Sequence, residues 1–247
     1  DIYESMSLLD LKHYISELFT GLKHVHEKGI IHRDIKPGNF LYNKKRKEGY
    51  IGDFGLAQKF TVNDIQTSNA KNGSKRKLKT NGQNRRDGYL KHDPRKPIHV
   101  DRSGTKSFRA PEIYLHSPRQ TTVAMDIWAV GVILLSFLAN VFPIFNPKDG
   151  AEGLIELTEV FGLKKMREFA KFYGRNIKTN LPGMPEEAPD MDELCRTLNN
   201  DKIASWDNEE YLLALDLMKK CLQLIDSDRI TAVDALKHPF LKEVVKN

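Results

Sequence analysis

The longest apolar run of the chain is IWAVGVILLSFLA, residues 127–139, and it constrains the fold more than any other segment. A helix that spans a bilayer needs about 20 apolar residues, and this run has thirteen. The run is apolar on every side, which is typical of a helix buried in a large core, and Asp126 stands at its start. We therefore expect a globular protein with no membrane segment, built around this central helix.

Length and cysteine content further limit the possible domain organisation and cellular compartment. The chain has 247 residues, of which 40% are hydrophobic and 29% charged, so it is large enough to bury a substantial core as one large domain or two small ones. Cys195 and Cys221 form neither a metal-ligand spacing nor a disulfide framework, which favours a reducing intracellular compartment. The chain begins at Asp1 without a secretory signal, and we interpret it as part of a longer protein.

The net charge of +6 is concentrated in residues 60–103. This segment carries eleven Lys and Arg against four Asp, whereas the rest of the chain carries 28 basic against 29 acidic residues. It is rich in Asn, Gly, Ser and Lys, so it cannot bury enough apolar surface to offset the entropy of ordering. We predict a basic, flexible insert here. Its run KRKLK and the run KKRK at 44–47 are either nuclear-import or DNA-contacting patches or, more commonly, solvated loops.

The remaining pattern predicts a mainly helical fold with one small β-hairpin. Apolar residues recur at helical spacing between Ser7 and Gly29, where Ser7 and Asp10 have the pattern of a capping box and Gly29 is a C-terminal stop. The stretches NFLYN and GYIGDF, separated by KKRKEG, predict the hairpin. Further helices are expected in the segments GLIELTEVFG, KKMREFAKFYG, YLLALDLMKKCLQLI and TAVDALKHPFL.

The stretch HRDIKPGNF, residues 32–40, concentrates groups that suit phosphate chemistry. Asp34 can accept a proton from a hydroxyl, and Lys36 can neutralise charge that develops on a phosphoryl group. Asn39 offers an amide oxygen to a hard cation such as Mg²⁺, and Asp53 in GDFGLA offers a carboxylate. These residues predict a site for phosphoryl transfer.

Three motifs follow one another along the chain: HRDIKPGNF, DFG, and APE at 110–112. In this order they resemble three motifs of the protein kinases. The resemblance implies a kinase that transfers the γ-phosphate of ATP to Ser or Thr of protein substrates. It assigns catalytic roles to Asp34, Lys36 and Thr105 of GTKSF. By the same likeness, Lys36, Asn39 and Asp53 bind the ATP and Mg²⁺ cofactors, and Asn39 and Asp53 are the metal ligands.

The resemblance also implies structural roles. Asp126 is expected to brace the backbone of the catalytic loop, and Arg229 of DSDRITAVDALKHPF is expected to pair with Glu112. His32 is interpreted as a packing residue against the aromatic ring of DFG. Arg33 binds either a phosphorylated activation segment or the same segment through a structural contact.

Within the family, three features are most similar to the cell-division-cycle-seven kinases: NFLYN, the long insert before GTKSFRAPE, and MDELCRTLN. These kinases start DNA replication with a regulatory subunit of the Dbf-four type. The likeness implies a nuclear cell-cycle kinase that binds an activating subunit, with help from the insert. It also implies helicase subunits as substrates, with acidic residues beside the target that Lys106 and Arg109 attract.

The sequence departs from the family in one decisive respect. It contains no Gly-rich phosphate loop, no strand with a nucleotide-anchoring lysine and no partner glutamate, all of which belong to the N-terminal lobe. We therefore interpret residues 1–247 as a C-terminal lobe without its N-terminal lobe, and expect this chain alone not to turn over ATP.

Two other functions remain open. A pseudokinase or scaffold that only binds a partner protein is disfavoured because Asp34, Asn39 and Asp53 are all present. A nucleic-acid-binding module based on the insert is disfavoured because Phe60 and Tyr89 are its only aromatic residues, which leaves little to stack on bases.

Overall fold

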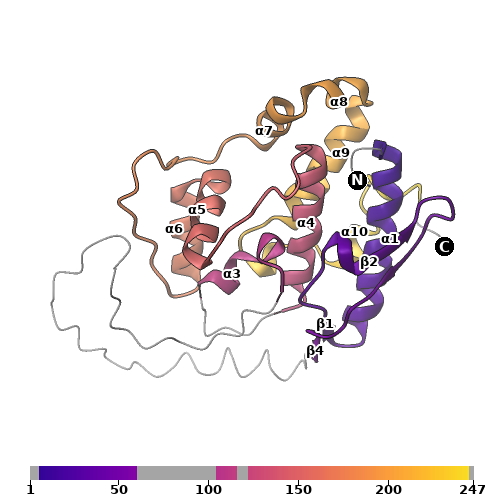
Figure 1. The fold of residues 1–247 in the computed structure, drawn as a ribbon, viewed down its shortest axis with the longest axis horizontal. Helices are drawn as coiled ribbons and strands as arrows, with labels where there is room; N and C mark the ends of the chain where they lie inside the picture. The colour runs from indigo at the N-terminus through magenta and orange to yellow at the C-terminus, as the bar shows by residue number, and fades with distance from the viewer. Residues whose placement is uncertain (1–5, 60–103, 116–121, 245–247) are drawn as a thin grey trace.

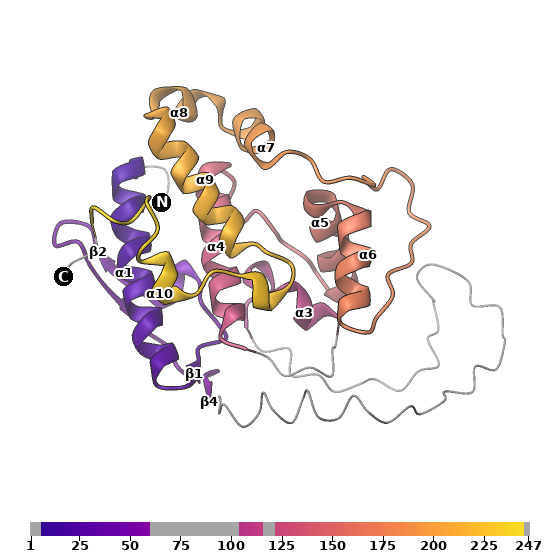
Figure 2. The ribbon, with the colours of Figure 1, turned by 180° about the vertical axis from the view of Figure 1, so that it is seen from behind.

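The computed structural model describes residues 6–59, 104–115 and 122–244, and this part of the chain is mainly helical (Figures 1 and 2). The α-helices are α1 (Leu8–Glu27), α3 (Pro111–Tyr114), α4 (Ala124–Leu138), α5 (Gly150–Phe161), α6 (Leu163–Phe172), α7 (Met191–Leu198), α8 (Asn200–Ser205), α9 (Asn208–Cys221) and α10 (Ala232–Ala235). The 3₁₀ turns are η1 (Pro37–Asn39), η3 (Lys106–Phe108) and η4 (Asp226–Asp228). The strands are β1 (Ile30–Ile31), β2 (Phe40–Asn43), β3 (Glu48–Ile51) and β4 (Gln58–Lys59). The predicted insert, residues 60–103, lies outside the described residues.

Helix α1 begins and ends where its sequence predicts. The Ser7 hydroxyl accepts a hydrogen bond from the Asp10 backbone N–H at 3.1 Å, and the Asp10 carboxylate accepts one from the Ser7 N–H at 3.0 Å. This capping box satisfies two backbone donors that the first turn leaves without a helical partner. Beyond the other end, Gly29 has a φ of +66°, a conformation that glycine adopts at little cost.

The predicted hairpin is confirmed as β2 paired antiparallel with β3, with Phe40 opposite Ile51. The Phe40 and Tyr42 rings pack against Tyr14 of α1, with centroid distances of 4.9 and 5.2 Å. Because side chains alternate along a strand, the residue between them, Leu41, points to the other face and is exposed. A second antiparallel pair, β1 with β4, was not predicted, since each strand has only two residues.

Helix α4 is the central helix that the apolar run predicts. Every residue from Met125 to Leu138 is buried, and Figure 1 shows α4 between α1 on one side and α5 and α6 on the other. Helix α9 packs closely on α4 at Gly131, where a Cβ atom would lie 2.7 Å from the Leu222 side chain. Among the described residues, no helix is both long and apolar enough to cross a bilayer.

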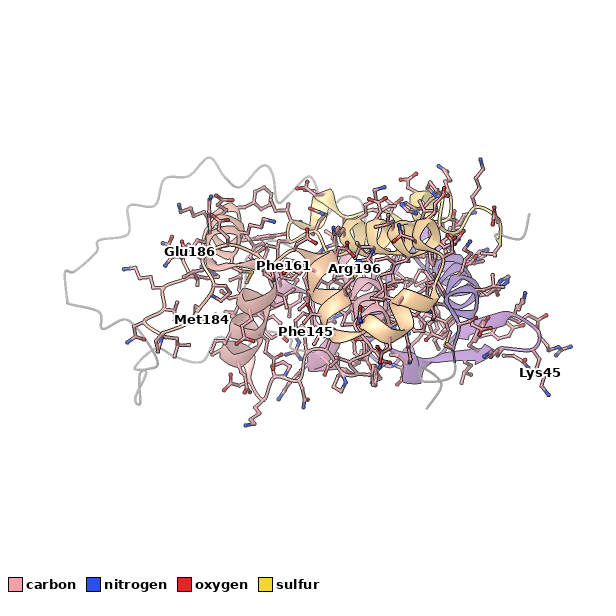
Figure 3. All side chains as sticks on the ribbon, turned by 90° about the horizontal axis from the view of Figure 1, so that it is seen from above. Lys45, Phe145, Phe161, Met184, Glu186 and Arg196 are labelled. Atoms are coloured by element: carbon pink, nitrogen blue, oxygen red, sulfur yellow. The ribbon has the colours of Figure 1, made fainter. Side chains whose placement is uncertain are left out.

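The later helices are confirmed, with two differences from prediction. Helix α10 is shorter than the stretch TAVDALKHPFL, because Pro239 has no N–H to continue a helix and the chain runs on in turns. Helix α8 forms in a region without a clear helical pattern. Figure 3 shows the long axis of the molecule, with Lys45 at the hairpin tip and Met184 of the loop before α7 toward opposite ends.

Arg229 contacts three other segments at the base of α4, and the predicted pair with Glu112 is confirmed. Its guanidinium makes a bidentate contact to the Glu112 carboxylate at 2.8 and 2.6 Å. The remaining three N–H groups donate to the backbone carbonyls of Ala124, Gln223 and Leu224 at 2.7 to 3.1 Å. All five donors of this buried side chain are thus satisfied, which compensates for its removal from water.

We predict that Arg229→Ala destabilises the fold by about 3–5 kcal/mol, because it leaves the Glu112 carboxylate buried without a partner. For a chain of this size, this corresponds to a fall in melting temperature on the order of 10 °C, measured by circular dichroism. The control is Arg167→Ala, which removes an exposed pair with Glu186 and should change stability by less than about 1 kcal/mol. Equal melting temperatures for the two variants would contradict the role of Arg229.

Candidate active site

A buried carboxylate fixes the loop that carries the predicted catalytic residues. Asp126 is 1% exposed, and its Oδ1 accepts a hydrogen bond from the Arg33 backbone N–H at 2.8 Å. Its Oδ2 accepts from the His32 backbone N–H at 2.8 Å and lies 3.0 Å from His26 Nε2. The predicted bracing of the catalytic loop by Asp126 is therefore confirmed. It holds Arg33 at a φ of +72°, a left-handed conformation that a residue with a side chain seldom adopts.

Asp34 follows this loop and lies at the centre of a hydrogen-bond cluster. Its Oδ1 accepts from the backbone N–H and the hydroxyl of Thr105, at 2.7 and 2.9 Å. Its Oδ2 accepts from Lys36 Nζ at 2.7 Å and from Asn39 Nδ2 at 3.0 Å. Lys36 Nζ also donates to Thr105 Oγ1 at 2.8 Å. The structure thus brings together four of the five predicted site residues around one carboxylate.

The charge state of Asp34 follows from two opposing effects. Burial by itself would raise the pKa of this carboxyl, but hydrogen bonds from Lys36 and Thr105 and the positive charge of Lys36 outweigh it. The pKa of Asp34 is therefore lowered from its ordinary value of 3.8. Its ionisation stabilises the fold above that ordinary value, and this contribution is lost as the pH falls through the lower folded-state pKa. Near neutral pH the group is an acceptor only.

Gly104 allows Thr105 to reach Asp34. Its φ is +94°, and a Cβ atom at this position would lie 2.4 Å from the Arg33 carbonyl oxygen. No residue with a side chain fits so close to the catalytic loop. Sequence reasoning missed this requirement, although the glycine stands directly before Thr105 in GTKSF.

Asn39 directly precedes β2, and Asp53 lies two residues after β3, the strand paired with β2. The Gly52 N–H donates to the Asn39 carbonyl at 2.8 Å, and Asp53 is the residue directly after Gly52. Asp53 is exposed, and its Oδ1 accepts from the Gly55 N–H at 3.2 Å. Because Asn39 donates through Nδ2 to Asp34, its amide oxygen remains an available acceptor.

This donor set fits a divalent cation that is shared with a nucleotide. In the described part of the chain, no group of three or more His, Cys, Asp or Glu side chains is arranged to hold a metal. A cage built from His, Cys, Asp and Glu side chains alone is therefore not present among these residues. Mg²⁺ bound with phosphates uses only one or two protein carboxylates and completes its shell with phosphate and water oxygens. Asn39 and Asp53 suit that kind of site.

An apolar platform lies beside these polar groups. Leu41 of β2 and Tyr50 of β3 are directly paired across the hairpin, and each is 67% exposed. Side chains paired across two strands share a face of the sheet, so the two make one surface next to Asn39. A flat apolar ring is a natural occupant of such a surface. Sequence reasoning missed this pair. The alternation in NFLYN indicates it, because Phe40 and Tyr42 share one face of the strand and Leu41 lies on the other.

Two neighbours of the site have packing roles. The predicted contact of His32 with Phe54 is confirmed, with ring centroids 4.9 Å apart, and His32 Nε2 also lies 2.9 Å from the Gly52 carbonyl oxygen. Arg33 donates from Nη1 to the Gln58 side-chain oxygen at 3.2 Å. This contact gives Arg33 a role in joining the catalytic loop to β4.

Lys106 and Arg109, predicted to attract acidic substrate residues, differ in their surroundings. Arg109 donates from Nη2 to the Gly104 carbonyl at 3.0 Å, and its guanidinium lies over the Tyr114 ring at 5.6 Å. Lys106 is exposed and donates to the Lys148 carbonyl, while its own carbonyl accepts from the Tyr114 hydroxyl at 2.9 Å. Lys106 is thus held at the surface beside Thr105, whereas Arg109 supports the backbone of the loop.

The basic run at 44–47 forms the tip of the β2–β3 hairpin. Lys44 pairs with Asp10 at 2.9 Å, and Lys47 Nζ lies 2.8 Å from His13 Nε2, so two of its four side chains contact α1. This is a folded turn and not an extended basic peptide. The second run, KRKLK at 75–79, lies outside the described residues.

We predict that Thr105→Val raises the pKa of Asp34, because it removes one hydrogen bond to the carboxylate. The measurement is a ¹³C NMR titration of the Asp34 carboxyl, which requires no catalysis. Thr105→Ser keeps the hydroxyl and is the control, so its pKa should stay near that of the parent chain. An unchanged pKa in the valine variant would mean that the hydroxyl does not bond to Asp34 in solution.

Comparison with known proteins agrees with this geometry. The family model described as "Protein kinase domain" matches residues 2–81 and 88–241. A "Probable cell division control protein 7 homolog 2" of Encephalitozoon cuniculi is 39% identical over 250 residues, which cover 99% of this chain and 69% of the relative. The "Cell cycle protein kinase spo4" of Schizosaccharomyces pombe is 38% identical, covering 97% of this chain and 59% of the relative. The "Cell cycle serine/threonine-protein kinase hsk1" of the same yeast is 36% identical, covering 97% and 49%. The chain therefore belongs to the protein kinase family, within the cell division control protein 7 group of serine/threonine kinases.

Proposed function

We propose that this kinase transfers the γ-phosphate of ATP with Asp34 as the group that orients and deprotonates the substrate hydroxyl. The observation that carries the proposal is the Asp34 carboxylate, which is kept ionised by Lys36 and Thr105 and lies in one cluster with Asn39. Phosphoryl transfer depends on positioning and charge neutralisation more than on covalent catalysis, and these groups supply both.

The steps follow from the donors around Asp34. The hydroxyl of a substrate Ser or Thr takes the place of the Thr105 hydroxyl as donor to Oδ1, while the Thr105 N–H continues to hold that oxygen. Asp34 accepts the proton as the substrate oxygen bonds to the γ-phosphorus and the bond from that phosphorus to the bridging oxygen breaks, which releases ADP. Lys36 Nζ, which already reaches both Asp34 and Thr105, neutralises the charge on the transferred phosphoryl group.

Asn39 Oδ1 and the Asp53 carboxylate are the protein ligands that we assign to the divalent cation, and we propose that this cation is Mg²⁺. When bound, the ion neutralises charge on the nucleotide phosphates. Asn39 would then have two tasks, since its Nδ2 orients Asp34 while its oxygen would serve as a metal ligand. Leu41 and Tyr50 supply an apolar surface on which the nucleotide base packs.

We further propose that Lys106 selects substrates with an acidic residue beside the target Ser or Thr. Its side chain uses one of three N–H donors on the Lys148 carbonyl and keeps two for a ligand. Arg109 contributes indirectly, because its bond to the Gly104 carbonyl holds Thr105 in position.

The names of the relatives support a role in the cell cycle. We propose that the kinase acts in the nucleus at the initiation of DNA replication, with replicative helicase subunits as substrates and a regulatory subunit as activator. We also propose that nucleotide turnover needs N-terminal-lobe elements that the sequence of residues 1–247 does not supply. A protein in which such elements are joined to residues 1–247 is the form to assay.

We predict that Asp34→Asn in a protein that also contains the N-terminal-lobe elements lowers kcat by at least about 100-fold, since general-base assistance supplies about 10²–10⁴-fold. The affinity for ATP should be retained, because Lys36, Asn39 and Asp53 remain. The measurements are steady-state phosphorylation of a protein substrate and equilibrium binding of a fluorescent nucleotide.

Asp201→Asn, at an exposed position of α8, is the control and should retain the parent rate. Parent-like turnover by Asp34→Asn would refute the assignment of the base. Loss of nucleotide affinity in the same variant would instead give Asp34 a structural role.

A further inference from the structure

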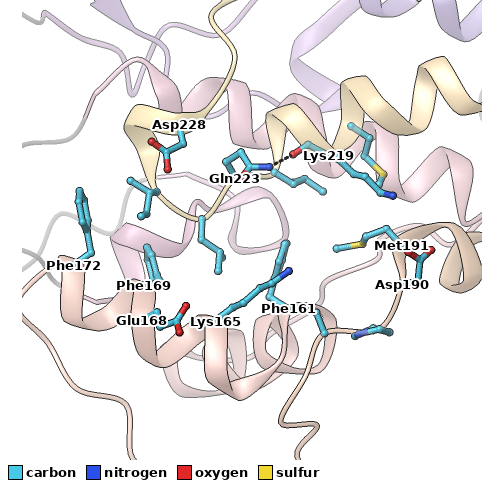
Figure 4. Close-up of a pocket in the computed structure, with 16 residues that line it drawn as sticks. Phe161, Lys165, Glu168, Phe169, Phe172, Asp190, Met191, Lys219, Gln223 and Asp228 are labelled. Carbon is cyan, nitrogen blue, oxygen red and sulfur yellow. Dashed lines mark hydrogen bonds between the residues drawn. The ribbon is translucent and has the colours of Figure 1, made fainter.

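A groove of about 710 Å³ lies between α6 and the segment from the end of α9 to η4, far along the chain from the catalytic loop (Figure 4). Its floor is apolar and is formed by Phe161, Phe169, Met218 and Leu222, all of which are buried side chains at its base. Met191 at the start of α7 closes one end. The groove shares no lining residue with the site around Asp34.

The charges on the two walls have the same order. On α6, Lys165, Glu168 and Phe172 are three and four residues apart, so they lie on one face of the helix in that order. On the facing wall, Lys219 lies toward the Met191 end of the groove, whereas Asp228 lies toward the Phe172 end (Figure 4). Each wall therefore has a lysine toward the Met191 end and a carboxylate toward the Phe172 end.

Among these four charged side chains, the Asp228 carboxylate accepts a hydrogen bond from the Ser227 hydroxyl at 3.2 Å, and the charge of Lys219 contributes to the lowered pKa of Asp190. None of Lys165, Glu168, Lys219 and Asp228 forms an ion pair with another described residue. Asp190 also lines the basic end, but its Oδ1 accepts hydrogen bonds from the backbone N–H groups of Asp192 and Glu193. Its charge caps α7, and the hydrogen bonds lower the pKa of its carboxyl.

This arrangement discriminates among occupants. A fatty acid or another anionic amphiphile would match the two lysines, but it would bring no positive charge to Glu168 and Asp228. A peptide segment can satisfy both ends, because it can carry an acidic side chain, apolar anchors and a basic side chain in sequence. Lys165 and Phe172 are seven residues apart on α6, so the walls extend about 10 Å. That length suits three or four residues of an extended peptide.

We propose that this groove is a docking site for a segment of a partner protein, in which apolar side chains lie between an acidic residue and a basic residue. The acidic residue faces Lys165 and Lys219, and the basic residue faces Glu168 and Asp228. Because the groove shares no lining residue with the site around Asp34, docking there recruits a protein without occupying the site of phosphate transfer.

The test uses this chain and a phage-displayed library of random dodecapeptides. Selection should enrich peptides with an acidic residue, apolar residues and a basic residue in one fixed order. The affinity of the best peptide is then measured by fluorescence anisotropy for the parent chain and for the double variant Lys165→Glu, Glu168→Lys, which reverses the order of charge on α6.

The double variant should bind the selected peptide about tenfold more weakly, because each surface charge pair is worth a few-fold in affinity and reversal turns attraction into repulsion. A peptide with its acidic and basic residues exchanged should bind the double variant better than the parent chain. Lys171→Glu, an exposed position on α6 outside the groove, is the control and should leave binding unchanged.

Three results would overturn the proposal. One is the absence of any enriched peptide whose binding depends on the groove. Another is equal binding by the parent and the double variant. The third is a different occupant, detected either as dimerisation in sedimentation that the double variant abolishes or as binding of decanoate that it abolishes. The assay involves no phosphoryl transfer, so its outcome is independent of the catalytic roles proposed above.

Discussion

The buried carboxylate of Asp126 is the constraint on which the geometry of the site depends. Its two oxygens hold the backbone of His32 and Arg33 and contact His26, so one group on α4 joins α1 to the catalytic loop. A carboxylate removed from water is costly unless it is hydrogen bonded, and here three donors offset that cost. Because Asp34 directly follows Arg33, the strained backbone that Asp126 stabilises determines where the reactive carboxylate points.

The parts of the site that are predictable from sequence are those that a short segment determines by itself. Asp34, Lys36 and Asn39 lie within six positions, so a loop and the η1 turn are enough to bring them together. Helix α1 and the β2–β3 hairpin follow from local caps and from apolar periodicity in the same way. The contact of Thr105 with Asp34 spans 71 positions, and it was predicted only through the resemblance to kinases.

The missed features depend on contacts between distant segments. The sequence does not distinguish Gly104 from other loop glycines, because its close contact with Arg33 exists only in the folded structure. The strands β1 and β4 are too short to have a sequence pattern of their own. The same holds for the groove beside α6. Its lysines and carboxylates look like ordinary surface charges in the sequence, and their common order becomes visible only when α6 and the end of α9 lie side by side. Local sequence patterns therefore predict helices and strands, whereas a surface formed by two distant segments can be recognised only from the tertiary structure.

Arg229 links the groove wall to α3, and this link limits how the groove and the site around Asp34 can influence each other. It binds the carbonyls of Gln223 and Leu224 in the groove wall and the carboxylate of Glu112 in α3, and it has no donor left over. A ligand that shifted this wall would have to break a hydrogen bond to a charged group, which costs about 1.5–3 kcal/mol. The binding free energy of a short docked peptide is too small to offset the cost of such a shift. Docking would therefore leave Asp34 and Thr105 in place and act by raising the local concentration of the bound protein near the site.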